Sequence, residues 1–127
     1  MLNQVTLQNY VPFLARIFLS AIFLKSGISK ILAPAATQAY MASQGLPFTG
    51  ILLMLTIVVL IIGGLSVLLG YKAKIGALLL IGFLIPATLI FHGDFPEEEI
   101  AFLKNLGLMG GLLMIVAFGS GSFSLEK

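Results

Sequence analysis

The sequence predicts an all-α protein, a transmembrane four-helix bundle with a short interfacial helix between its first and second spans. Of its 127 residues, 59% are hydrophobic and only 9% are charged, whereas soluble domains contain about 25% charged residues. The mean hydropathy of +1.12 points the same way. Four apolar runs are long enough, or nearly so, to cross a hydrocarbon core of about 30 Å. Because these runs take up most of the chain, we expect residues 1–127 to form a single integral membrane domain.

The first predicted span, residues 11–32, is apolar but contains several cations. A helix turns about 100° per residue, and one narrow face of this span therefore carries Arg16, Ser20, Phe23, Gly27 and Lys30. Lys25 lies on the opposite side. A cation at mid-membrane depth costs about 2.5–3.5 kcal/mol on insertion scales, so such residues usually face protein, water or headgroups. We therefore expect the face with Arg16 and Lys30 to point into the bundle.

The remaining elements follow from polarity and from helix start and stop signals. Residues 1–9 are polar and are expected to form a short lead-in, with Pro12 near the first helical turn, where its missing N–H costs little. Residues 33–50 are too polar to span, and Pro34 followed by TQAYMASQ predicts a short helix that caps one end of the bundle. Three further spans are predicted at residues 51–69, 75–91 and 100–118.

Four spans place both termini on the same side of the membrane as the link that carries Lys72 and Lys74. By the positive-inside rule, this side is predicted to be cytoplasmic, and the acidic loop at residues 92–99 is predicted to face outward. Lys25 and Lys30 lie toward the outer end of the first span and count against this orientation. The predicted location is the inner cell membrane, crossed several times, with both termini in the cytoplasm.

Polar residues of three spans are predicted to meet near the outer end of the bundle. Lys30 ends the first span, His92 follows the third, and Lys104 and Asn105 lie at the start of the fourth. Together with Arg16, which lies deeper along the first span, these are the candidate ligand-binding residues. All of these residues except Asn105 have a structural alternative. Lys30 can extend to lipid phosphates and Arg16 to the cytoplasmic membrane face. His92 can be a satisfied interfacial residue, and Lys104 can pair with an acid of the neighbouring loop.

The predicted interior combines cations and amide donors without a matching anion, because none of the four spans contains a carboxylate. Such a set of donors suits an anion, a lipid headgroup or the carbonyl groups of a quinone. Proton-coupled carriers usually relay protons through buried Asp or Glu residues. The sequence therefore favours binding of a small aromatic or anionic ligand over proton-coupled transport.

The chain contains no cysteine and a single histidine, His92. By itself it cannot form a disulfide, an iron–sulfur site or a thiolate nucleophile, and we expect no metal site and no intrinsic cofactor. The net charge of +2, with no basic run, does not support nucleic-acid binding. No motif of a self-sufficient enzyme is present, so the sequence leaves open whether the protein is an enzyme. A quinone held here would need a partner subunit to exchange electrons with it.

Several residues occur along the chain in an order that is typical of one known family. They are Arg16…Phe23…Gly27-x-x-Lys30, Gly45-x-Pro47, Gly63-Gly64…Gly70, Phe91-His92 and Phe102-x-Lys104-Asn105-Leu106…Gly110-Gly111. Through this ordered set, which covers nearly the whole chain, the sequence resembles the DoxX family. The resemblance implies a four-helix integral membrane protein. The family takes its name from a subunit of an archaeal thiosulfate:quinone oxidoreductase, and some bacterial members are linked to quinone or catechol stress and to thiol and oxidative-stress defence.

One position departs from the family pattern. Many relatives carry a glutamate three residues before the double glycine of the second span, and here that position is Leu60. If that acid pairs with the arginine of the first span or takes part in chemistry, this chain lacks it. The departure weakens any transfer of an enzymatic role from the family to this chain.

Three functional hypotheses follow. The first is a DoxX-like inner-membrane protein that binds a quinone, or a related small aromatic or anion, near the outer face, alone or as the membrane subunit of an oxidoreductase complex. The second is a non-enzymatic scaffold, assembly factor or stress-response protein. The third, less favoured, is a small-molecule carrier. Besides the lipid bilayer, the partners considered are a redox subunit and a second copy of the chain, since Gly107-x-x-x-Gly111 suits either a dimer or packing within the bundle.

Overall fold

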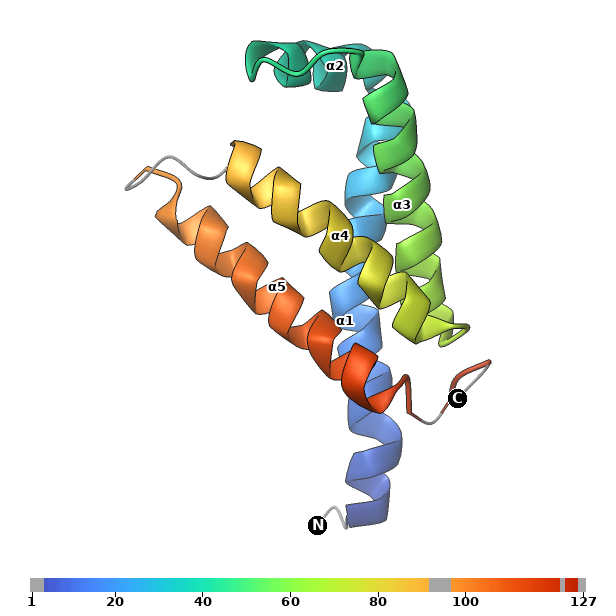
Figure 1. The fold of residues 1–127 in the computed structure, drawn as a ribbon. Coiled ribbons are helices and arrows are strands. Elements are labelled where there is room, and N and C mark those ends of the chain that lie inside the picture. Colours follow the sequence, from blue (N-terminus) through green and yellow to red (C-terminus); the bar gives the residue numbers. More distant parts are fainter. Residues whose placement is uncertain (1–3, 92–96, 122, 126–127) are drawn as a thin grey trace.

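The computed structural model describes residues 4–91, 97–121 and 123–125. It contains five helices and, within these residues, no strand (Figure 1). The helices are α1 (Gln4–Leu32), α2 (Pro34–Ser43), α3 (Thr49–Leu69), α4 (Ala73–Phe91) and α5 (Glu99–Phe118). Four of them, α1, α3, α4 and α5, are long and apolar enough to cross a membrane. The predicted all-α membrane bundle is thus confirmed, and α2 is the short helix expected between the first two spans.

The predicted spans match the observed helices closely except at the N-terminus. We expected residues 1–9 to precede the first helix, but α1 already begins at Gln4 and Pro12 lies inside it. The expectation that Pro12 lies near the first helical turn was therefore wrong. A proline at this place removes the N–H that would bond to the carbonyl of residue 8, and its ring crowds that carbonyl. Residue 8 is an exposed glutamine.

The four long helices pack in series along the chain. Most contacts between helices are made by α1 with α3, by α3 with α4 and by α4 with α5, whereas α1 barely touches α5. Figure 1 shows that α1 and α3 run side by side, that α4 and α5 form a second pair, and that the two pairs diverge toward the end where α2 lies across the bundle. The N-terminal end of α1 and the C-terminal end of α5 lie at the opposite end.

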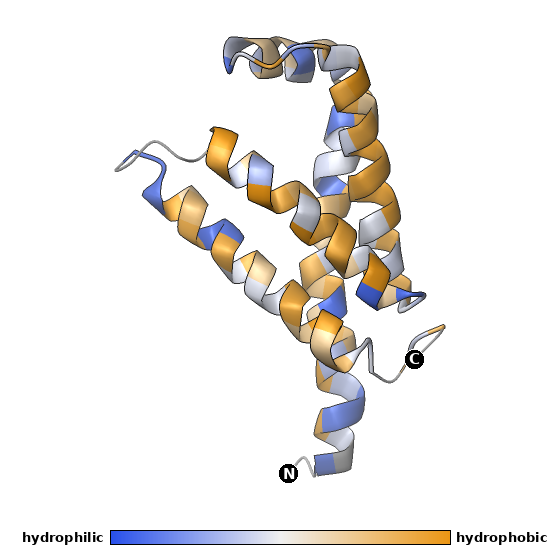
Figure 2. Cartoon of the chain, in the orientation of Figure 1, coloured by the Kyte–Doolittle hydropathy of each residue, from blue (hydrophilic) through white to orange (hydrophobic). Residues whose placement is uncertain are grey.

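Glycines bring these helices into close contact. A Cβ atom on Gly63 of α3 would lie 2.8 Å from Cγ of Leu80 on α4, and one on Gly64 would lie 2.8 Å from Cδ2 of Leu24 on α1. The two neighbouring glycines therefore face different partner helices, as is common where membrane helices approach closely. Around these contacts lies a core of fully buried side chains that includes Leu60 and Val67. Apolar residues also cover the outer surfaces of α3 and α4 (Figure 2).

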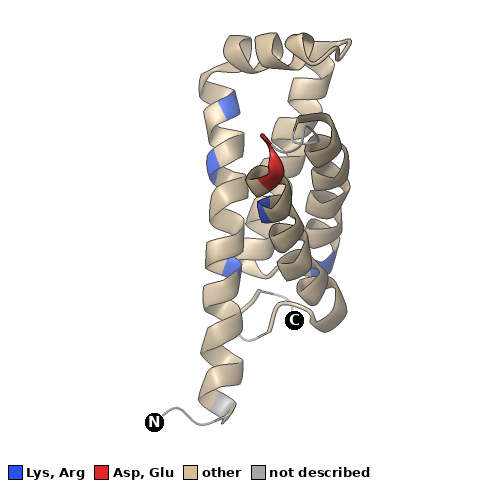
Figure 3. Cartoon of the chain, turned by 90° about the vertical axis from the view of Figure 1, so that its left-hand side faces the viewer, with Lys and Arg blue, Asp and Glu red and all other residues tan. Residues whose placement is uncertain are grey.

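The polar face predicted for the first span does point inward. Arg16, Ser20 and Phe23 are buried, Gly27 is buried and Lys30 is half-buried. Lys25, on the opposite side of α1, is exposed. Basic residues therefore occur at several levels along α1, whereas the described acidic residues gather at the start of α5 (Figure 3).

Candidate functional site

A cavity of about 560 Å³ lies between α2 and the diverging ends of the other helices. Residues of all five helices line it. It forms because the α4–α5 pair joins the rest of the bundle mainly through contacts of α4 with α3, makes few contacts with α1, and diverges from α1 and α3 toward this end. The short helix α2 covers this end of the bundle, and it contacts both α1 and α3. A volume of this size falls within the range of sites that hold small organic molecules.

Lys30 supplies the positive charge of the cavity. It lies in the last turn of α1, where a cation also interacts favourably with the helix dipole. Its Nζ donates a hydrogen bond of 2.8 Å to Oγ of Ser26, one turn earlier on the same face. Both residues line the cavity, and Lys30 is the single charged side chain among the described residues that line it. The lysine is held by its neighbour but keeps further donors on its ammonium group.

Asn105 supplies an amide on the α5 side of the cavity. Its side chain is buried, and Nδ2 donates a hydrogen bond of 3.0 Å to Oγ1 of Thr88 on α4. This bond joins α4 to α5 and fixes the orientation of an amide that lines the cavity. An amide has two N–H donors and a carbonyl acceptor, so the bond to Thr88 leaves it further capacity for a ligand.

Aromatic and aliphatic side chains form most of the wall. The rings of Tyr40 on α2 and Phe91 on α4 stack with their centroids 5.1 Å apart and an angle of 23° between their planes. This contact attaches α2 to the end of α4 at the edge of the cavity, which both residues line. Leu60 of α3, the position where the family resemblance leads one to expect an acid, is buried and lines the same cavity. The site is thus an apolar slot with a cation and an amide.

The structure brings together only part of the predicted ligand-binding set. Lys30 and Asn105 line the cavity. Lys104 is exposed and does not line it, although it directly precedes Asn105. His92 lies outside the described residues. Arg16 lies deep along α1, as expected, but it is not among the residues that line the cavity.

Arg16 instead holds the C-terminal segment, of which residues 119–121 and 123–125 are described. Its guanidinium is buried and donates hydrogen bonds to the carbonyl oxygens of Phe123 (2.8 Å, from Nη2) and Leu68 (3.4 Å, from Nη1). The guanidinium carbon lies 5.5 Å from the centroid of the Phe13 ring. The segment is also tied to α3 by a backbone hydrogen bond of 3.0 Å from Leu125 N–H to the carbonyl of Leu69. The arrangement is that of a structural anchor.

Sequence reasoning missed several residues of the cavity. Ser26 could have been found, because it lies four residues before Lys30 and therefore on the same helix face. Tyr40 lines the cavity, and Thr88 does not line it but accepts the hydrogen bond of Asn105. Neither carried such a local signal, since each acquires its role through a partner on another helix.

Comparisons with known proteins agree with this architecture. The family model described as DoxX matches residues 11–93. The chain is 34% identical over 123 residues to Inner membrane protein YqjF of Escherichia coli (strain K12), and this match covers 95% of this chain and 93% of that protein. It is 28% identical over 121 residues to Inner membrane protein YphA of the same organism, covering 90% of this chain and 86% of that protein.

A third match is partial. The chain is 35% identical over 72 residues to Surfeit locus protein 4 homolog of Drosophila melanogaster, and the match covers 48% of this chain but only 26% of that protein. No solved structure matches the chain.

Proposed function

Because the chain belongs to the DoxX family, we propose that it is a membrane protein that binds a quinone, or a related small aromatic compound with acceptor oxygens, in the cavity beneath α2. The observation that carries this proposal is the combination of Lys30 and Asn105 with an otherwise apolar and aromatic wall. Quinones have the matching chemistry, with a flat apolar ring that bears carbonyl acceptors.

The chemistry of the wall defines the class of ligand. The ammonium of Lys30 and the amide of Asn105 donate hydrogen bonds to carbonyl or anionic oxygens, and in a low-dielectric cavity such bonds are stronger than in water. The stacked rings of Tyr40 and Phe91 offer a surface for an aromatic ring. Since no acidic side chain is found among the described lining residues, the cavity disfavours cationic ligands.

Any redox chemistry of the bound quinone involves a partner. The chain has no cysteine, so a thiol or an iron–sulfur centre would belong to another subunit. In this proposal the protein positions the quinone, alone or as the membrane subunit of an oxidoreductase complex. The relatives named inner membrane proteins support the same location for this chain. The end that carries Lys72 and Lys74 would then be cytoplasmic.

One observation favours a second candidate, a scaffold that binds no ligand. The two polar groups of the cavity already have partners within the protein, Lys30 with Ser26 and Asn105 with Thr88. In a scaffold these bonds would serve only to hold the helices together, and α2 would cap the bundle without covering a binding site.

Calorimetric titration of the detergent-purified protein with decylubiquinone separates the two candidates. We expect saturable binding that is about tenfold weaker in Lys30→Met and in Asn105→Leu, because each variant loses a hydrogen-bond donor in a buried site. Lys104→Gln is the matched control, since Lys104 is exposed and adjacent to Asn105. Binding that is absent in the wild type, or weakened equally by all three changes, would overturn the proposal. Lower melting temperatures without any ligand effect would support the scaffold.

A further inference from the structure

A second hollow lies outside the bundle, on the outer faces of α3 and α4. It is a groove of about 320 Å³ that ends at the link between these helices. Its walls are side chains that the protein leaves exposed, among them Leu65 of α3 (42% exposed) and Ile75 and Leu79 of α4 (56% and 42% exposed). The groove does not share a residue with the cavity beneath α2.

Close packing beneath the groove explains its shape. A Cβ atom on Gly76 would lie 2.5 Å from Cβ of Ser66, so α3 and α4 approach here with hardly a side chain between them. The hydroxyl of Ser66 is engaged with the carbonyl oxygens of Tyr71 (2.6 Å) and Lys72 (3.0 Å). Between α3 and α4 the groove therefore offers a shallow apolar surface, which suits a hydrocarbon chain and not a soluble anion.

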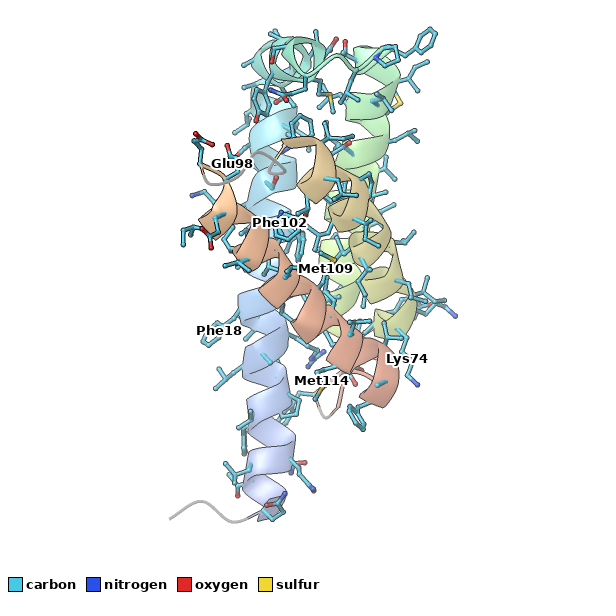
Figure 4. All side chains as sticks on the ribbon, turned by 60° about the vertical axis from the view of Figure 1, so that its left-hand side comes forward. Phe18, Lys74, Glu98, Phe102, Met109 and Met114 are labelled. Carbon is cyan, nitrogen blue, oxygen red and sulfur yellow. The ribbon has the colours of Figure 1, made fainter. Side chains whose placement is uncertain are left out.

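A cation marks the end of this groove. Lys72 lies in the link with a left-handed backbone (φ 50°), and the bonds from Ser66 fix that link. Its ammonium lies 5.7 Å from the centroid of the Tyr71 ring. Lys74, at the start of α4, projects from the same end of the molecule (Figure 4). The described acidic residues, at positions 97–99, lie at the opposite end of the bundle (Figure 3).

We propose that this groove is a binding site for an anionic glycerophospholipid, with one acyl chain lying between α3 and α4 and the phosphate at Lys72. Charge complementarity selects the anionic class, because Lys72 lies where an apolar groove meets the end of the membrane-spanning helices. A zwitterionic lipid would fit the groove equally well but would gain less from this lysine. The site is independent of the ligand proposed for the cavity beneath α2.

Native mass spectrometry of the detergent-purified full chain tests the site. The protein is titrated with phosphatidylglycerol or with phosphatidylethanolamine of the same acyl composition. We expect tighter binding of phosphatidylglycerol, and in Lys72→Gln an affinity for this lipid that is about fivefold weaker, the factor that corresponds to about 1 kcal/mol for one lysine at a membrane surface. Lys25→Gln is the matched control, because Lys25 is an exposed lysine of α1 away from the groove.

A steric variant tests the bed of the groove separately from its charge. Leu65→Trp fills the groove from an exposed position, so it should reduce binding of both lipids and leave the fold intact. Equal binding of the two lipids by the wild type would overturn the proposal. So would equal losses in Lys72→Gln and Lys25→Gln, which would indicate attraction by net charge alone, or unchanged lipid binding in Leu65→Trp.

Discussion

Replacing Arg16 with methionine should release the C-terminal segment from the bundle. Methionine roughly matches the length and apolar stem of arginine but removes the donor that binds the carbonyl of Phe123 at 2.8 Å. The backbone bond from Leu125 to Leu69, further along the same segment, then loses its support. The contacts of the Phe123 ring with Tyr10 and Phe13, at centroid distances of 5.2 and 5.7 Å, remain.

The hydrogen bonds of Arg16 set the size of the effect. A hydrogen bond from a charged donor contributes about 1.5–3 kcal/mol, and the bond from Arg16 to Phe123 is shorter, and therefore stronger, than its bond to Leu68. The bond to Leu68, at 3.4 Å, anchors the end of α3 and contributes little to the segment itself. Local opening of the segment around Phe123 and Leu125 should therefore become easier by about 1.5–3 kcal/mol, which corresponds to amide exchange about 10 to 150 times faster.

Hydrogen exchange followed by mass spectrometry measures this opening directly. Peptides that include the Leu125 amide should exchange faster in Arg16→Met, whereas Lys25→Met, which removes an exposed cation from the same helix, should behave like the wild type. Because Arg16 does not line the cavity, binding of decylubiquinone should not change. Unchanged exchange together with weaker quinone binding would refute the anchor and restore the ligand-binding role that the sequence predicts for Arg16.

Two further substitutions probe neighbouring parts of the structure. Gly70→Ala should lower the free energy of unfolding by at least about 1–2 kcal/mol, since Gly70 has φ +69° and a Cβ there would collide with Arg16 and Ser124. Thermal unfolding in detergent measures the effect, and an unchanged melting temperature would count against the tight contact. Thr88→Val should lower the free energy of unfolding by about 1–2 kcal/mol, because it removes the acceptor of the Asn105 hydrogen bond. Thr88→Ser keeps the hydroxyl and should lower this free energy by less. Equal losses in the two variants would show that the hydrogen bond contributes nothing.

Hydropathy and helical periodicity were sufficient to predict the spans because both are local properties of the sequence. The inward face of α1 is the clearest case, since the 100° turn per residue alone separates buried Arg16 from exposed Lys25. The start of α1 could not be predicted in the same way. Polar residues such as Gln4 and Gln8 give no hydropathy signal. These residues nevertheless extend the apolar helix that follows them toward the N-terminus, and Pro12 lies inside the extended helix.

The candidate site was predictable only where one helix determines it. Lys30 was placed correctly near an end of the bundle because its depth follows from its position in the first span. Lys104 and Asn105 are adjacent, and membrane depth cannot distinguish them, yet packing of α5 against α4 buries the second and exposes the first. The role of Arg16 depends on a chain segment more than 100 residues away, where Phe123 supplies the acceptor, and no local pattern encodes that contact.

The two inward cations of α1 have different roles, and this difference bears on the missing family glutamate. Arg16 is held by backbone carbonyls at one end of the bundle, so it needs no carboxylate from α3 to be accommodated. Leu60 lies instead in the cavity that contains Lys30. An acid at position 60 would therefore add a negative charge to the ligand cavity and give Lys30 a potential counter-ion. With Leu60 in place, the charge of Lys30 remains available to an anionic or carbonyl-bearing ligand, which is consistent with the proposed class of ligand.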